Sequence, residues 1–229
     1  MTAVFITATG TDIGKTFVAR GLIRELRAQG RKVEALKPVV SGFEPLEAKG
    51  SDPGILLAAV GRDVTDDEIA RIAPWRFAAP LAPHMAARRE GRTIDFADVV
   101  AFMRQAIAKR SDVLIIEGVG GIMVPLDDTH TVLDVMGEVR LPLLVVAGTY
   151  LGTISHTLSA LDVLDRRGLD IAALVVSETA GSPVALDDTI ASIVQFAPSL
   201  AVIGIPRLPA GKLDHPAFSH IAERLPQST

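Results

Sequence analysis

A glycine-rich turn between a short apolar strand and an amphipathic helix opens this chain, with the sequence Ala8-Thr9-Gly10-Thr11-Asp12-Ile13-Gly14-Lys15-Thr16. The apolar run before it covers residues 3–6, and a helical pattern with one apolar face covers residues 17–29. A strand, a tight turn and a helix N-terminus together aim backbone N–H groups at an anion. Lys15 can then reach the outer phosphates of a nucleotide, and the Thr16 hydroxyl can bind Mg²⁺. The pattern predicts a phosphate-binding loop (P-loop).

The strict form of such a loop has glycine at position 9, where this chain has Thr9. The match therefore rests on Gly14-Lys15-Thr16 and on the strand and helix that flank it. A glycine turn followed by a helix with an exposed lysine is the structural alternative.

Short apolar runs alternate with helical patterns along most of the chain. Strands are predicted at 3–7, 32–37, 113–117, 143–147, 172–176 and 201–205, and helices at 15–29, 96–109, 154–167 and 184–196. Aromatic residues make up only 4% of the chain, so aliphatic side chains must fill the core, as in a parallel sheet buried on both faces. We predict one α/β domain over residues 1–229, a P-loop NTPase fold whose mostly parallel sheet has helices on both faces. Residues 42–91 form an insert near the active site, and residues 210–229 a polar C-terminal tail.

Charge and composition exclude several classes of protein. The net charge of −4 gives no basic footprint for nucleic acid. The absence of cysteine excludes disulfides, cysteine metal sites and a cysteine nucleophile. No apolar run reaches the ~18 residues of a membrane span, and the N-terminus lacks the pattern of a signal peptide. We expect a cytoplasmic protein that binds neither membranes nor nucleic acid.

A second motif, Val113-Leu114-Ile115-Ile116-Glu117-Gly118-Val119-Gly120-Gly121, places an acid at the end of an apolar strand. A carboxylate there, beside a phosphate loop, is typical of a Walker-B Mg²⁺ ligand. The glycines after it allow the backbone to approach a nucleotide closely. An exposed glutamate followed by a flexible turn is the alternative.

A third group follows the second predicted strand. Lys37 ends that strand on the same sheet edge as Lys15, and Ser41 offers a hydroxyl in the loop after it. Two ammonium groups around one phosphoryl group suit phosphoryl transfer, because negative charge spreads over the transferring oxygens. Asp52 is a candidate second acid for Mg²⁺. Taken singly, Lys37 could be a solvated lysine, and Asp52 a turn residue or helix cap.

In their order and spacing these motifs resemble the dethiobiotin synthetase family, from residue 3 to about residue 209. The pieces that carry the resemblance are Thr11-Asp12-Ile13-Gly14-Lys15-Thr16, Lys37-Pro38-Val39-Val40-Ser41-Gly42, Ser51-Asp52, Phe77-Ala78-Ala79-Pro80-Leu81-Ala82-Pro83-His84, Glu90-Gly91-Arg92, Glu117-Gly118-Val119-Gly120-Gly121, Leu151-Gly152-Thr153-Ile154-Ser155-His156 and Gly204-Ile205-Pro206.

The resemblance implies a ligase that uses ATP and Mg²⁺ in biotin biosynthesis. One amine of 7,8-diaminopelargonic acid takes up CO₂ as a carbamate, which attacks the γ-phosphate of ATP. The resulting carbamic–phosphoric anhydride is closed by the second amine, with loss of phosphate. The family also implies a homodimer, because the substrate carboxylate is bound partly across a two-fold interface.

Carried over by position, the resemblance assigns roles to individual residues. Lys37, Lys15 and Thr11 are the expected catalytic residues, and Thr16, Asp52 and Glu117 the expected metal ligands. Substrate contacts are expected from Thr11, Lys37, Ser41, Gly152, Thr153 and Ser155. Nucleotide contacts are expected from Asp12, Ile13, Gly14, Lys15, Thr16, Phe17, Asp52, Glu117, Gly118, Val119, Gly120, Ser177, Glu178, Pro206, Arg207 and Leu208.

The chain departs from the family pattern at four positions. Ala8 and Gly10 replace a usual glycine and aspartate in the loop, and Ser155 replaces a common asparagine. Ser177 stands where the family often has an asparagine that reads adenine, and a hydroxyl cannot make the two contacts of an amide. We therefore expect weak selectivity for the nucleotide base.

Other P-loop classes fit less well. A partitioning ATPase of the deviant-Walker type usually has an extra lysine at the position of Gly10, and this chain does not. An amidotransferase that amidates a corrin ring adds a glutaminase domain with a nucleophilic cysteine, which 229 residues without cysteine cannot supply. A non-catalytic nucleotide-binding module stays open as an alternative.

Overall fold

The core of the protein is a parallel sheet of six strands in the order β2-β5-β1-β6-β7-β8. The computed structural model describes residues 1–110 and 112–226. The strands are β1 (Thr2–Ala8), β2 (Val33–Leu36), β5 (Val113–Glu117), β6 (Leu143–Ala147), β7 (Ile171–Ser177) and β8 (Val202–Ile205). Every residue of β1, β5 and β6 is buried, as a continuous aliphatic run in a parallel sheet requires.

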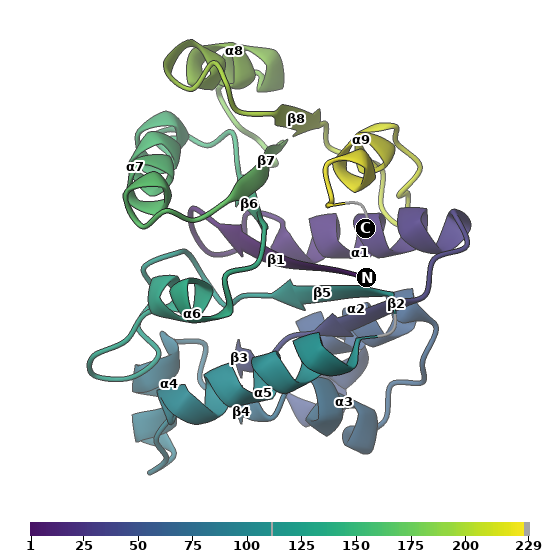
Figure 1. The fold of residues 1–229 in the computed structure, drawn as a ribbon, viewed down its shortest axis with the longest axis vertical. Coiled ribbons are helices and arrows are strands. Elements are labelled where there is room, and N and C mark those ends of the chain that lie inside the picture. The colour runs from purple at the N-terminus through teal and green to yellow at the C-terminus, as the bar shows by residue number, and fades with distance from the viewer. Residues whose placement is uncertain (111, 227–229) are drawn as a thin grey trace.

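Helices cover both faces of this sheet, which confirms the predicted fold class. Figure 1 shows α1 and α9 on one side of the central strands, and α6 and α7 on the other. The helices that follow the sheet strands are α1 (Lys15–Ala28), α5 (Phe96–Lys109), α6 (Val132–Val139), α7 (Thr153–Arg166), α8 (Leu186–Phe196) and α9 (Ala217–Glu223). None of the helices in the described ranges is long and apolar enough to cross a bilayer.

The segment after β2 supplies several smaller elements beside that edge of the sheet (Figure 1). They are β3 (Val39–Ser41), η1 (Pro45–Gly50), α2 (Asp52–Val60), α3 (Asp66–Ile72), β4 (Trp75–Phe77) and α4 (Pro83–Arg89). Strands β3 and β4 pair in parallel as a separate two-stranded sheet. The Ser51 hydroxyl caps α2 by accepting from the Gly54 N–H at 3.3 Å, which places Asp52 in the first turn of the helix.

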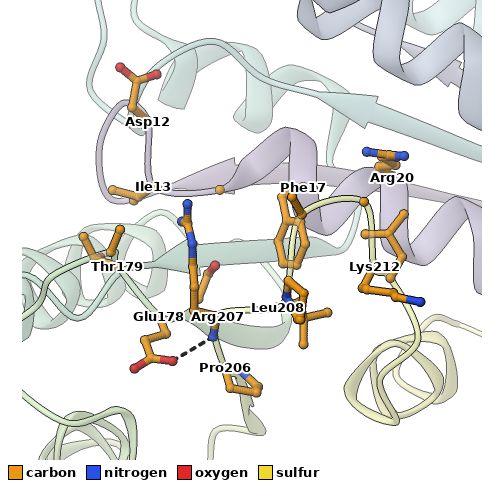
Figure 2. Close-up of a pocket in the computed structure, with 17 residues that line it drawn as sticks. Asp12, Ile13, Phe17, Arg20, Glu178, Thr179, Pro206, Arg207, Leu208 and Lys212 are labelled. Atoms are coloured by element: carbon orange, nitrogen blue, oxygen red, sulfur yellow. Dashed lines mark hydrogen bonds between the residues drawn. The ribbon is translucent and has the colours of Figure 1, made fainter.

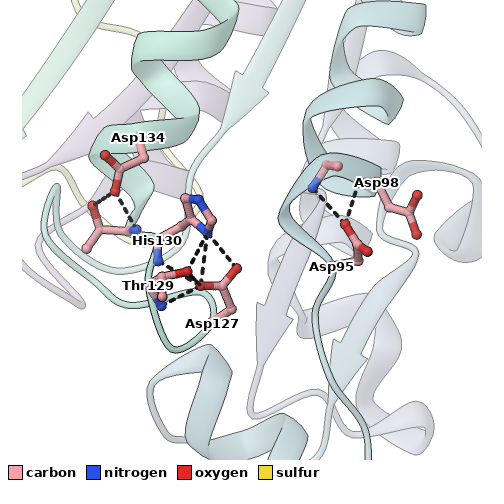
Figure 3. Close-up of polar contacts among 8 residues, drawn as sticks. Asp95, Asp98, Asp127, Thr129, His130 and Asp134 are labelled. Atoms are coloured by element: carbon pink, nitrogen blue, oxygen red, sulfur yellow. Dashed lines mark hydrogen bonds and ion pairs between the residues drawn. The ribbon is translucent and has the colours of Figure 1, made fainter.

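Helix α6 was not predicted, although its start carries a recognisable signal. Asp134, at the third helical position, accepts from the backbone N–H of Thr131 at 2.8 Å. The turn before it is closed by Asp127, which accepts from the backbone N–H groups of Thr129 and His130, each at 2.7 Å (Figure 3). These short-range hydrogen bonds form a turn in the segment after β5. The helix that follows the turn lies beside α5.

The prediction of a polar C-terminal tail was wrong for its described part, residues 210–226. Helix α9 packs on α1, and Phe218 is only 1% exposed. The ring of Phe218 meets Phe17 edge-on, with centroids 5.8 Å apart. The segment therefore completes the core next to the phosphate loop. Residues 227–229 lie outside the described ranges.

The absence of a side chain at Gly21 makes this packing possible, so replacing Gly21 should destabilise the fold. A Cβ atom on Gly21 would lie 2.0 Å from Cε1 of the buried Phe218. We expect Gly21→Ala to lower the free energy of unfolding by about 1–3 kcal/mol through overpacking. Helix propensity alone would favour alanine by about 1 kcal/mol. Urea unfolding measures the change.

Gly137 is the matched control, because it also lies in a helix and a Cβ there meets no atom within 4 Å. Gly137→Ala should leave stability unchanged or raise it by up to about 1 kcal/mol. Equal effects of the two substitutions would show that Phe218 does not press on Gly21.

Candidate active site

The phosphate loop joins β1 to α1 through two residues with left-handed backbone. Asp12 has φ 57° and Gly14 has φ 105°, conformations that favour glycine and that aspartate tolerates. Left-handed residues spaced so closely turn neighbouring backbone N–H groups toward one concave side, where an anion can bind. Lys15 begins α1 and is only 7% exposed, and its Nζ donates to the Gly10 carbonyl at 3.2 Å. The alternative of an exposed lysine is therefore wrong.

Lys37 lies at the centre of a buried charged cluster. Its Nζ is 2.6 Å from Glu117 Oε1 and 2.9 Å from Asp52 Oδ2, and it donates to the Gly118 carbonyl at 3.0 Å. Lys37 is 2% exposed and Glu117 is fully buried, so neither is the solvated side chain of the alternative interpretation. The register of the sheet explains why these residues meet, because Glu117, the last residue of β5, pairs with Ile6, two residues before β1 ends at the loop.

Opposite charges within the cluster offset the cost of burying Lys37 and Asp52 in their ionised forms. Burial lowers the pKa of the Lys37 ammonium, but the Glu117 and Asp52 carboxylates outweigh burial and raise that pKa above its ordinary value. Burial also works against ionisation of Asp52, yet Lys37 and the Thr16 hydroxyl hold the pKa of this carboxyl below its usual range. The pair is therefore an ammonium and a carboxylate at neutral pH.

The pKa of Lys15 is shifted in the opposite direction to that of Lys37. Burial, followed by repulsion from Lys37, lowers the pKa of Lys15 to about 8. Its ammonium thus lacks full compensation inside the free protein. A polyanion bound at the loop would supply the missing negative charge, which is the role that the sequence predicted for nucleotide phosphates.

Thr16, Asp52 and Glu117 meet as predicted for a cation site. Thr16 Oγ1 lies 2.7 Å from both Asp52 Oδ1 and Glu117 Oε1. A hydroxyl has one proton, so it can donate to only one of them at a time. Glu117 Oε2 is buried with no hydrogen-bond partner among the described residues. An oxygen-rich cluster with an unsatisfied carboxylate oxygen fits Mg²⁺, which takes its remaining ligands from water and phosphate.

Two cavities open on either side of the loop and share Asp12, Gly14 and Phe17. The first, about 750 Å³, lies over the charged cluster. It is lined by Thr11, Lys15, Thr16, Lys37, Ser41, Asp52, Val119 and Gly120, with residues 80–83 of the insert opposite. Ser41 Oγ is buried there without a partner in the described structure. This cavity has the polar groups for a substrate and transferring phosphate.

The second cavity, about 530 Å³, lies between the loop and the strand ends of β7 and β8 (Figure 2). It is lined by Ile13, Ser177, Glu178, Pro206, Arg207 and Leu208, six of the residues from which nucleotide contacts were expected, and it is called the nucleoside cavity below. Glu178 Oε2 accepts from the Arg207 backbone N–H at 2.7 Å and so holds the segment after β8. Arg20, Thr179 and Lys212 also line it, and the sequence did not single them out. The helical spacing could have indicated Arg20, because it lies one turn after Phe17 on the same face of the helix. No sequence pattern indicated Lys212.

Comparison with known proteins identifies the family. A family described as an AAA domain matches residues 2–212. The ATP-dependent dethiobiotin synthetase BioD of Acidiphilium cryptum is 49% identical over 196 residues, which cover 85% of this chain and 88% of that protein. The same enzyme of Methylobacterium nodulans is 45% identical over 222 residues, 93% of this chain and 98% of that protein. The chain belongs to the dethiobiotin synthetase family.

The fold is shared more widely than the dethiobiotin synthetase family. The cell division ATPase MinD of Pyrococcus furiosus superposes with a TM-score of 0.56 at 18% identity, over 98% of each chain. At this identity the likeness concerns the fold alone. The membership inferred from the motifs is confirmed by the much closer dethiobiotin synthetase relatives.

Three of the expected substrate-binding residues lie in neither cavity. Gly152, with φ 95°, caps α7, and Ser155 is exposed one turn later. The hydroxyl of buried Thr153 donates to the Gly148 carbonyl at 2.8 Å, so it holds the loop after β6. The structure therefore does not bring these residues to Lys37 within one chain. Gly118 lines neither cavity and contacts Lys37 through its carbonyl.

Proposed function

We propose that the protein closes the ureido ring of 7,8-diaminopelargonic acid with CO₂, at the expense of ATP, to give dethiobiotin in biotin biosynthesis. The observation that carries the proposal is the Lys37 ammonium, buried between two carboxylates and lining the same cavity as Lys15 and Ser41. Family membership supplies the reaction. The direct test is mass-spectrometric detection of dethiobiotin from the diamine, bicarbonate and MgATP.

The two lysines act on the transferring phosphoryl group from two sides in this reaction. A carbamate oxygen of the substrate attacks the γ-phosphorus, and the bond to the ADP oxygen breaks. Lys15, at the loop, and Lys37, from the substrate side, stabilise the charge that grows on the phosphoryl oxygens. The second amine then attacks the carbamate carbon, and inorganic phosphate leaves as the ring closes. Thr11 and Ser41 line the cavity where the diamine would lie.

Thr16, Asp52 and Glu117 would hold Mg²⁺, which neutralises charge on the phosphates. Asp52 is the best probe, because its side chain is 41% exposed and its loss disturbs the core least. We predict that Asp52→Asn raises the Mg²⁺ concentration for half-maximal activity by roughly tenfold, about 1.4 kcal/mol. Asp98→Asn is the control, because Asp98 is also an acid in a first helical turn but lies exposed on α5. An unchanged Mg²⁺ requirement in Asp52→Asn would remove it from the metal site.

The second cavity would take the nucleoside, and we predict relaxed choice of base. A site built to pair with one base edge rejects others strongly, because its own polar groups are left unpaired. Ser177 has a hydroxyl that donates or accepts, and Glu178 is already engaged by Arg207. GTP and CTP should support kcat/KM values within roughly tenfold of ATP, about 1.4 kcal/mol. A preference for ATP above about a thousandfold, near 4 kcal/mol, would show that another group reads adenine.

Gly152, Thr153 and Ser155 would contact the substrate carboxylate across a homodimer interface. Their position outside the cavities of one chain is compatible with a role in a partner's site, and Leu151 beside them is 82% exposed. A backbone turn at the start of α7 suits a carboxylate. The homodimer and the cytoplasmic location remain predictions.

A further inference from the structure

A basic groove lies on α1, away from the charged cluster around Lys37. It has a volume of about 450 Å³ and is lined by Arg20, Arg24, Arg27 and Lys49, with Ile55, Ala58, Ala59 and Leu213 as its apolar part. No aspartate or glutamate of the described chain lines it. We propose that this groove binds a small organic phosphate, a phosphoryl group joined to an apolar body, separately from the nucleotide at the loop.

The spacing of the arginines supports a single anionic ligand. Arg20, Arg24 and Arg27 lie four and three positions apart on α1, so they are neighbours on one face of the helix. Like charges at these spacings destabilise a helix. In the described structure none of the four cations has an ion-pair partner that would offset the repulsion, and Arg27 donates only to the Ala59 carbonyl, at 2.7 Å. A bound anion would supply the missing charge.

Phosphate is the anion that this arrangement favours. Guanidinium groups bind phosphate through two parallel hydrogen bonds, and Lys49 reaches in from η1 as a point charge. The volume is in the range of small-molecule sites. A chain with a net charge of −4 whose basic groove is only about 450 Å³ in volume does not present the extended basic surface that nucleic acid needs.

The apolar residues indicate that the phosphate belongs to an organic molecule. Ile55 and Ala58 come from α2, and Leu213 from the segment before α9, so two parts of the chain distant in sequence supply the apolar surface of the groove. The groove adjoins the nucleoside cavity, since Arg20 and Leu213 line both. Figure 2 shows Arg20 and Lys212 at the end of that cavity away from Thr179. A ligand in the groove would therefore lie beside the nucleotide.

The test is calorimetric titration with phenyl phosphate, in the presence of a saturating non-hydrolysable MgATP analogue that fills the loop. The probe variant is Arg24→Gln/Lys49→Gln, which leaves both site cavities intact because neither residue lines them. The control is Arg89→Gln/Lys109→Gln, which removes the same charge from exposed positions outside the groove. All altered side chains are exposed, so the variants should fold, and thermal unfolding checks this.

We expect saturable binding to the unaltered and control proteins, and at least tenfold weaker binding to the probe variant. Inorganic phosphate should bind more weakly than phenyl phosphate to the unaltered protein, because it lacks the apolar body. No saturation below about 10 mM, equal affinity of the probe and control variants, or inorganic phosphate binding as tightly as phenyl phosphate would each overturn the proposal. The measurement does not depend on the proposed ring-closing activity.

Discussion

Lys37→Gln should lower kcat by about 100-fold or more, near 3 kcal/mol, while the dissociation constant for MgATP stays within a few-fold of the unaltered protein. Lys37 follows β2 and lines the cavity over the cluster, but not the nucleoside cavity. We therefore expect its ammonium to act on the carbamate and the transferring phosphoryl group more than on the bound nucleotide. Steady-state kinetics with saturating diamine and bicarbonate, together with nucleotide titration, separate the two effects.

The same substitution should also destabilise the fold, and this must be measured alongside. It leaves the fully buried Glu117 carboxylate without its ammonium partner, and breaking a buried pair costs about 3–5 kcal/mol. Kinetics are therefore measured well below the melting temperature of the variant, with Lys109→Gln as an exposed control. Weak nucleotide binding with normal turnover at saturation would assign Lys37 to the nucleotide instead.

Lys15→Ala should lower kcat/KM by about 100-fold, again near 3 kcal/mol, because a charge that stabilises the transition state is lost. Its effect on stability should be the opposite of that of Lys37→Gln. Burial and Lys37 lower the pKa of Lys15 to about 8, so the ammonium is unfavourable in the free protein at pH 7. Removing it should leave the melting temperature unchanged or raise it.

Thermal unfolding and kinetics on the same preparation test both parts of this prediction. Near-normal turnover by folded Lys15→Ala protein would contradict the assignment of the loop. A large loss of stability would show instead that the Lys15 ammonium is well compensated before any nucleotide binds.

The sequence was sufficient for the parts of the fold that short-range patterns determine. The run β1–loop–α1 and the strand before Glu117 were predictable, because aliphatic runs, glycine turns and helix periodicity each have a local cause. The three-residue strands β3 and β4 were not, since they are too short to show a period. The packing of α9 could not be predicted, because the Phe218 ring occupies space left by the absence of a side chain at Gly21, almost two hundred residues away.

The candidate site was predictable for a different reason. The carboxyl ends of parallel strands share one edge, so residues after β1, β2 and β5 had to meet there. Periodicity could not show that Lys37 is buried between Asp52 and Glu117, because that depends on how α2 docks on β2. Arg20 and Lys212 were not predicted, because they belong to no sequence motif. They line the nucleoside cavity only as a result of how α1 and the C-terminal segment pack.

Ring closure is tested by measuring phosphate release from MgATP in four mixtures: with the diamine alone, with bicarbonate alone, with both, and with neither. We predict release only when both are present, with one dethiobiotin formed for each phosphate. Ring closure uses both the carbamate and the second amine, so neither substrate alone completes the reaction. Release at the same rate without the diamine or without bicarbonate would identify a nucleotide-driven switch and contradict the proposed ring closure.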